Sequence, residues 1–286
     1  MTTTKTTTFR LALAAGAAFA TLALAGQASA CAGAGVVTRI EGNPAAVSIK
    51  RADGGAVARP RVMEVVCAGD VINAGGAKVT LSLDGRGSVQ VSGSYKVAAR
   101  GGAPSLAGNA YRAVNDQVLP DMKRLPWDVR LKGPDDPLGF ALPTLAQGSQ
   151  KLPAGNHSLL VRVLGGTGPY SAVLEGGNAP VSATSATGEI RLPSAALGAG
   201  RYTVTVKDAT GESVTGQFSV VSPAQPVPDT YRELTDPEVR AAATAASMAR
   251  GAPTTRSFEA EQLLDKAPSN GLDRQRVFDL IESYGE

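Results

Sequence analysis

Alternation of apolar and polar residues is the clearest pattern in this chain. From residue 78 onward every second side chain is apolar, namely Val79, Leu81 and Leu83. Successive side chains on a β-strand point to opposite faces. The pattern therefore predicts a strand with its apolar row in a core and its polar side chains, Ser82 among them, in water.

Further short strands are predicted on both sides of this segment, because apolar runs recur between turns rich in Gly, Asn, Asp and Pro. They lie at 37–40, 47–49, 57–59, 89–91, 95–99, 157–164, 170–174, 181–184, 188–192, 202–207 and 216–221. The 33 Gly, the 18 Pro and the low aromatic content are typical of short strands joined by tight turns. We therefore expect a mainly β protein.

The C-terminal part has a different composition, rich in Ala, Glu and Arg. Asp236 is placed to cap a helix that continues to Arg250. Two more helices are expected at 257–266 and 273–283, the last with an apolar face that includes Phe278 and Ile281. Short helices rarely hold alone in water, so these faces must close on one another, on the β part or on a partner.

The first residues predict export. An apolar run at 11–26 follows Lys5 and Arg10 and precedes the small residues 28–30. Small side chains at these positions are what a signal peptidase accepts. The run is shorter than the roughly 20 residues of a membrane-spanning helix. We expect a cleaved signal peptide, no later transmembrane span, and a periplasmic or otherwise extracytoplasmic protein.

Two cysteines follow the predicted cleavage point, Cys31 directly and Cys67 later. An even pair in an exported protein favours a disulfide. In the chain-entropy picture that bond would stabilise the fold by about 3–4 kcal/mol. A lipid anchor on Cys31 is the alternative and would exclude the disulfide. It is disfavoured because lipoprotein signals usually have Leu, Val or Ile where this chain has Ala28.

The elements divide the chain into five segments. These are a signal peptide at 1–30, a β domain at 31–112, a Pro-rich linker at 113–143, a β-sandwich at 144–222 with residue 125 as an alternative start, and a helical region at 229–286. We expect an antiparallel β roll, then a sandwich, then short C-terminal α-helices.

Three segments of the first β domain together resemble a known family. They are 35–42, with a strand followed by Glu-Gly, 69–72, with the sequence Gly-Asp-Val-Ile, and 77–85, an alternating strand that ends in Asp-Gly. In order and spacing, residues 35–99 resemble the extracytoplasmic domain of the FecR family. The resemblance implies an antiparallel β roll that serves recognition, signalling or assembly in the bacterial envelope.

The residues of this signature are interpreted as structural. We expect Gly69 to supply a backbone angle that other residues avoid, and Asp70 to accept hydrogen bonds from nearby amides. Asp84 and Gly85 form a second turn of this type. FecR proteins also have a cytoplasmic segment that controls a sigma factor and one transmembrane helix. We expect neither here, because only ten residues precede the apolar run.

The second β segment resembles bacterial immunoglobulin-like modules. The resemblance lies in Gly-Thr-Gly-Pro-Tyr at 166–170 and Tyr-Thr-Val-Thr-Val-Lys-Asp at 202–208. It implies a β-sandwich and says nothing about a ligand. The residues before Tyr202 resemble a tyrosine corner, in which the hydroxyl bonds back to an earlier backbone group.

Motifs for catalysis or metal binding are lacking in the sequence. Two cysteines and the lone His157 cannot supply four metal ligands. The glycine-rich loop at 165–169 lacks the Lys-Ser/Thr ending of a phosphate-binding loop, and no Gly-x-Ser-x-Gly turn is present. A catalytic pair of carboxylates that are distant in sequence but close in the fold stays an open alternative. A formal net charge of +3 argues against the dense basic face of a nucleic-acid binder.

We therefore expect an exported, non-enzymatic module without cofactor or metal that recognises envelope proteins, such as a membrane-bound sensor or transporter. Candidate partner contacts are Trp127 in the linker and Phe278 and Ile281 in the last helix. Glycan or peptidoglycan binding is the main alternative, although few aromatic residues are available for stacking. An envelope hydrolase is the third reading.

Overall fold

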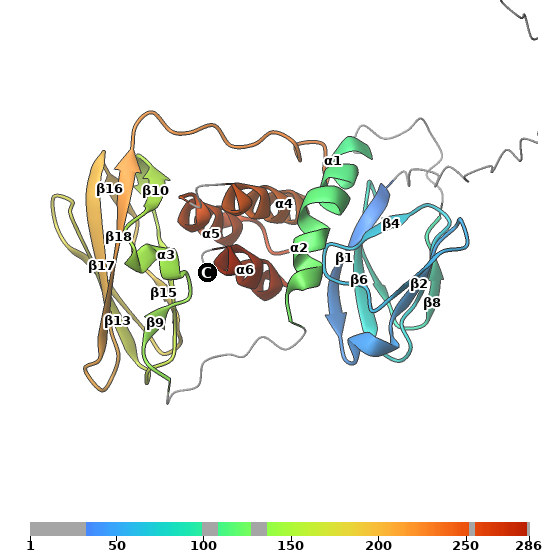
Figure 1. The fold of residues 1–286 in the computed structure, drawn as a ribbon, viewed down its shortest axis with the longest axis horizontal. Helices are drawn as coiled ribbons and strands as arrows, with labels where there is room; N and C mark the ends of the chain where they lie inside the picture. Colours follow the sequence, from blue (N-terminus) through green and yellow to red (C-terminus); the bar gives the residue numbers. More distant parts are fainter. Residues whose placement is uncertain (1–32, 99–107, 127–135, 252–254, 285–286) are drawn as a thin grey trace, which may run out of the picture. The chain divides into compact units, whose positions relative to one another are not determined.

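The computed structural model describes residues 33–98, 108–126, 136–251 and 255–284. Several antiparallel sheets and a group of C-terminal helices make up these residues, and strand residues outnumber helical ones (Figure 1). The expected mainly β class is therefore confirmed at this level. The signal segment, Cys31 and Trp127 lie outside the described residues.

Two four-stranded antiparallel sheets, ordered β4-β1-β6-β7 and β3-β2-β5-β8, build the first β region. Its strands are β1 (Gly33–Glu41), β2 (Ser48–Lys50), β3 (Ala56–Ala58), β4 (Val65–Cys67), β5 (Val71–Asn73), β6 (Lys78–Leu83), β7 (Gly87–Val91) and β8 (Ser94–Lys96). Both sheets contribute to one core, which includes Ile49 from β2, Ile72 from β5 and Val79 and Leu81 from β6. The apolar row predicted from the alternation is thus buried.

Ser82 on β6 departs from the predicted alternation, because its side chain is buried instead of facing water. Its hydroxyl donates to Asp236 Oδ2 at 2.7 Å. Asp236 precedes α4 (Pro237–Arg250), and its Oδ1 accepts from the amides of Glu238 and Val239. One carboxylate therefore caps a helix and attaches it to a strand. The expectation failed because the covering residue lies 154 positions away in the sequence.

Replacement of Asp236 by Ala should lower the free energy of unfolding by about 2–3 kcal/mol, because it removes a helix cap and the acceptor of Ser82. Ser82→Ala should cost about 1 kcal/mol. Urea unfolding of both single variants and the double variant measures their coupling. The exposed Ser88→Ala on β7 is the control. A coupling energy of zero would show that the bond contributes nothing to stability.

The second β region contains a five-stranded sheet, ordered β10-β18-β17-β13-β14, a three-stranded sheet, ordered β15-β12-β9, and the pair β11-β16. The elements are β9 (Gly139–Phe140), α3 (Pro143–Ala146), β10 (Gln150–Pro153), β11 (Gly155–His157), β12 (Leu160–Leu164), β13 (Tyr170–Glu175), β14 (Val181–Ser185), β15 (Glu189–Arg191), β16 (Ala195–Leu197), β17 (Gly200–Lys207) and β18 (Ser213–Val221). All ladders of the larger sheets are antiparallel except β10 with β18.

Aromatic side chains anchor the core of this region. Tyr202 stacks on Phe218 with ring centroids 5.6 Å apart, and Phe218 contacts Phe258 from the C-terminal helices at 5.1 Å. The Tyr202 hydroxyl donates to the carbonyl of Gly198 at 3.1 Å. The backward hydrogen bond expected for a tyrosine corner is therefore present.

A helical segment replaces part of the expected linker. It consists of α1 (Gly108–Ala113), a π-helical turn (Val114–Val118) and α2 (Leu119–Arg124). Several of its buried side chains, including Tyr111 and Met122, belong to the core of the C-terminal helices. The sequence pattern did not predict a helix at this segment, because Pro120 has no backbone donor for a hydrogen bond in a helix interior. Here the π-helical turn ends directly before α2, whose first turn accepts Pro120.

The three C-terminal helices have the predicted bounds within one residue. They are α4, α5 (Ser257–Lys266) and α6 (Arg274–Ser283), red in Figure 1, and they contact one another. Their common core includes Ala242 and Ala246 of α4 and Leu264 of α5. The apolar faces thus close within the chain.

Candidate functional site

The turn at Gly69 and Asp70 is a structural device. Gly69 has φ +89°, in the left-handed region that favours glycine. The buried Asp70 carboxylate accepts from the amides of Ala52 at 3.0 Å and Cys67 at 2.9 Å. It also accepts from Arg51 Nη1 at 2.7 Å. All of these donors are in the first β region, so the hydrogen bonds of this carboxylate stabilise the fold.

Arg51 extends this turn into a buried ion-pair network. Its Nη2 donates to Glu64 Oε1 at 3.0 Å, and its Nη1 donates to the carbonyl of Val65 at 2.7 Å. Lys123 of α2 lies 3.4 Å from the other Glu64 oxygen. The network therefore connects the turn, β4 and the helical segment, and sequence reasoning had treated only Asp70.

The second signature turn also bonds within the chain. Gly85 has φ +69°, and the buried Asp84 accepts from the Thr235 hydroxyl at 2.9 Å. Cys67 lies buried at the end of β4. Since Cys31 lies outside the described residues, its disulfide with Cys67 stays a prediction.

The candidate partner contacts in α6 are not on the surface. Phe278 is 5% exposed and Ile281 is 0% exposed, and both lie in the core formed by the helices. The lone histidine, His157, is half-buried, and its Nε2 donates to the carbonyl of Pro153 at 2.8 Å. Burial and, secondarily, Lys266 lower the pKa of this imidazole.

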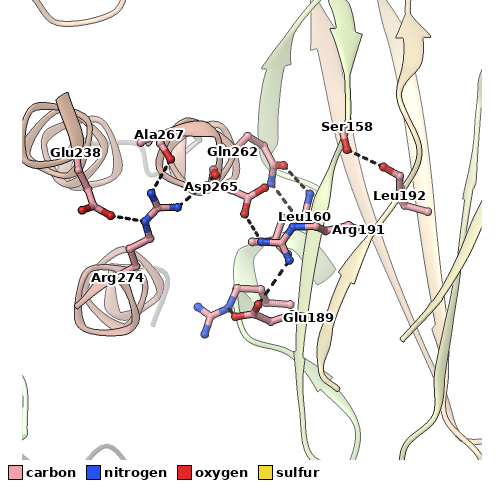
Figure 2. A network of polar contacts seen from close by, with 11 residues as sticks. Ser158, Leu160, Glu189, Arg191, Leu192, Glu238, Gln262, Asp265, Ala267 and Arg274 are labelled. Atoms are coloured by element: carbon pink, nitrogen blue, oxygen red, sulfur yellow. Dashed lines mark hydrogen bonds and ion pairs between the residues drawn. The ribbon is translucent and has the colours of Figure 1, made fainter. Parts of the chain in front are cut away.

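A polar network at the inner face of α5 is the main feature that sequence reasoning missed (Figure 2). Gln262 binds the backbone of β12 twice, since its Nε2 donates to the Leu160 carbonyl at 2.9 Å and its Oε1 accepts from the Leu160 amide at 2.8 Å. Arg191 of β15 pairs with Asp265 of α5. Its other carboxylate neighbour is Glu189, 3.7 Å away on the same strand. These contacts attach α5 to the second β region.

Arg274 and Glu238 continue the network between the helices. Figure 2 shows the Arg274 guanidinium between Glu238 and the α5 end at Asp265 and Ala267. Its Nε donates to Glu238 Oε1 at 2.6 Å, and its Nη2 donates to the Ala267 carbonyl at 2.5 Å. The ion pair therefore joins α4, α6 and the turn after α5.

Arg162 on β12 forms the most buried ionic cluster of this interface. Its side chain is 6% exposed, and its Nη1 donates to Glu282 Oε1. Its Nη2 donates to Gln275 Oε1 at 3.0 Å, and its Nε lies 3.7 Å from Glu189 Oε1. The guanidinium also lies 4.4 Å from the ring centroid of Phe278. Thus α6 is held on β12 through one cation.

Glu261 of α5 adds a second carboxyl to this cluster. It is 2% exposed and lies beside the Glu282 carboxyl, and its Oε1 has no hydrogen-bond partner. Burial raises the pKa of Glu261 well above the usual range of a glutamate, and the charge of Glu282 raises it further. Burial also raises the pKa of Glu282 to about 7, although Arg162 opposes this shift.

An open cleft of about 380 Å³ lies where α4 and α5 meet the segment before α4. Val227, 51% exposed, is the large apolar side chain that the described surface leaves in water. The cleft is lined by the apolar and small residues Val227, Pro228, Pro237, Ala241, Leu263, Ala267 and Pro268, and by the polar and charged residues Asp229, Arg232, Arg240, Thr244 and Lys266. Three cations and a single carboxylate thus surround an apolar floor.

Within the described ranges, no group of three or more His, Cys, Asp or Glu side chains is placed to hold a metal ion. The same ranges contain no helix with the length and apolar character of a membrane span. Comparison with known protein families, curated proteins and solved structures gives no match for this chain.

Proposed function

We propose that this chain is an exported, non-enzymatic protein of the bacterial envelope that recognises a protein partner through the cleft at α4 and α5. The first β region is proposed to be a FecR-like β roll and the second an immunoglobulin-like sandwich. Two sheets around one core support the first assignment. The five- and three-stranded sheets and the hydrogen bond of Tyr202 support the second.

The basic cleft is the observation that carries this proposal. A hollow of a few hundred Å³ that combines an apolar lining with a few polar groups is typical of binding sites. Arg232 is already paired with Asp229 at 2.8 Å, while Arg240 donates to the backbone carbonyls of Arg232 and Leu234. The cleft therefore keeps a positive excess at Arg240 and Lys266. This charge fits a partner segment with an apolar residue flanked by carboxylates.

The arrangement of the remaining ionic groups supports a binding role over catalysis. Arg51, Glu238 and Arg162 each use their charges to connect separate elements, as described above. Arg51 and Arg162 pair with carboxylates of the chain, and Glu238 accepts from Arg274 and from two backbone amides. These ionic groups stabilise the packing of the elements that they join. The apolar and positive character of the cleft comes from Val227 and the cations Arg240 and Lys266 instead.

Site-specific photocrosslinking tests the proposal. A photoreactive amino acid at Ala241 inside the cleft should capture one envelope protein, whereas the same probe at the exposed Ser88 should not. Reversing the charge at Arg240 and Lys266 should reduce that capture at least tenfold, about 1.4 kcal/mol. Lys50→Glu, on an exposed position of β2, is the matched control.

Capture that is equal from Ala241 and Ser88, or unaffected by the charge reversal, would contradict a partner site at this cleft. Strong pelleting of the protein with purified cell wall would instead favour the glycan-binding alternative.

A further inference from the structure

One buried cation faces a surplus of carboxyl groups where α5 and α6 pack on the second β region. The charged groups at this point are Arg162 from β12, Glu189 from β15, Glu261 from α5, and Glu282, Asp279 and, further out, Arg276 from α6. Glu189 is partly exposed and also pairs with Arg191, so water and a second cation share its charge. The inner part of the cluster is therefore Arg162, Glu261 and Glu282.

The geometry of this inner part leaves Glu261 without a cation of its own. Arg162 directs Nη1 to Glu282 and Nη2 to Gln275, so it acts on Glu261 through its charge, which partly opposes the rise in the pKa of that carboxyl. The neighbour of Glu261 on α6 is the Glu282 carboxyl. Two neighbouring carboxyl groups in a buried site can hydrogen-bond to each other only when one of them carries a proton. A second buried negative charge would be unpaired and strongly destabilising.

We propose that Glu261 and Glu282 share one proton, and that its release loosens the packing of α5 and α6 on β12. The contact is therefore a pH-sensitive joint between the C-terminal helices and the second β region. This inference goes beyond the proposed function and does not depend on it, because it concerns the chain alone.

The direction of the pH effect follows from linkage. In the unfolded chain both carboxyls titrate near 4.5, whereas burial raises the pKa of Glu282 to about 7 and that of Glu261 well above its usual range. Above the unfolded values the folded chain holds a proton that the unfolded chain has released. Stability contributed by this pair is therefore greatest in mild acid and falls as the pH rises from about 5 through 7. Ordinary salt-bridged carboxylates have the opposite dependence.

Unfolding of the full mature chain in urea at pH 5.5 and pH 8 tests this joint. One linked proton changes the unfolding equilibrium constant by up to tenfold per pH unit. We expect the wild-type constant to rise by roughly 10- to 100-fold over this range. Glu261→Gln keeps the hydrogen bond without the charge and should remove most of that rise. Glu259→Gln, on the same helix and paired with Arg256, should leave the slope with pH unchanged.

Two further readouts locate the effect. Hydrogen exchange, corrected for its intrinsic dependence on pH, should increase at pH 8 in 257–266 and 274–283 of the wild type and much less in Glu261→Gln. The infrared band of a protonated carboxyl should persist in the wild type at pH 6.5, so the joint stays testable if the variant does not fold. Equal pH slopes for the wild type and Glu261→Gln, or no such band, would overturn the proposal.

Discussion

Replacing Arg51 with Met should lower the free energy of unfolding by about 3–5 kcal/mol, which is the range for breaking a buried ion pair on one side. The variant leaves Asp70 and Glu64 buried after their main cation is removed. Lys123 reaches only one of these carboxylates and is itself half exposed. Equilibrium unfolding in urea measures the loss.

The pair Arg39 and Glu41 provides the matched control. Its atoms are 3.4 Å apart, but the two side chains are 44% and 48% exposed. Arg39→Met should therefore cost less than about 1 kcal/mol. Neutralising both carboxylates in the Arg51→Met background, with Asp70→Asn and Glu64→Gln, should recover part of the loss. If Arg51→Met cost no more than Arg39→Met, the buried network would not be a source of stability.

Replacing Glu238 with Ala should have an effect of the same size, about 3–5 kcal/mol, because it leaves the Arg274 guanidinium without its carboxylate. The lost carboxylate also accepts from the amides of Asn270 at 2.6 Å and Leu272 at 3.0 Å. The turn between α5 and α6 should therefore open. Limited proteolysis within residues 267–273 should become faster, and unfolding in urea should begin at a lower concentration.

A double-mutant cycle separates this ion pair from general damage. Arg274→Ala combined with Glu238→Ala should cost clearly less than the sum of the single variants, because both remove one shared interaction. The exposed pair of Arg232 and Glu233 serves as the reference, and Glu233→Ala should change stability by less than about 1 kcal/mol. Additive losses in the cycle would contradict the assigned role of Glu238.

Local sequence patterns predicted the helices and strands well, because strand alternation and helix capping act over only a few residues. The alternation that includes Val79 and Leu81 fixes a strand face whatever covers it. Asp236 and Pro237 mark the start of α4 because capping and a fixed φ act within one turn. The helices near Pro120 were missed for the opposite reason, since their stability comes from packing against distant residues.

The buried carboxyl pair was overlooked because charged residues were assumed to face water. The helical spacing of these residues did indicate their burial, however. Glu261 follows Phe258 by three positions, and Glu282 follows Phe278 by four, so each carboxyl shares a face with a buried aromatic side chain. That spacing places both glutamates in the interior. Their meeting with Arg162 could not be inferred, because the arginine lies about 100 residues earlier on a strand.

The hydrogen bonds of the C-terminal region have a consequence for the order in which this polypeptide folds. The C-terminal region supplies Asp236 to the first β region, across 154 residues from Ser82, and Gln262 to the second, across 102 residues from Leu160. Neither β region therefore completes its native contacts before the C-terminal region has joined it. Contacts between residues this far apart in sequence form slowly, because the entropy of closing a long loop is lost before the contact stabilises the fold.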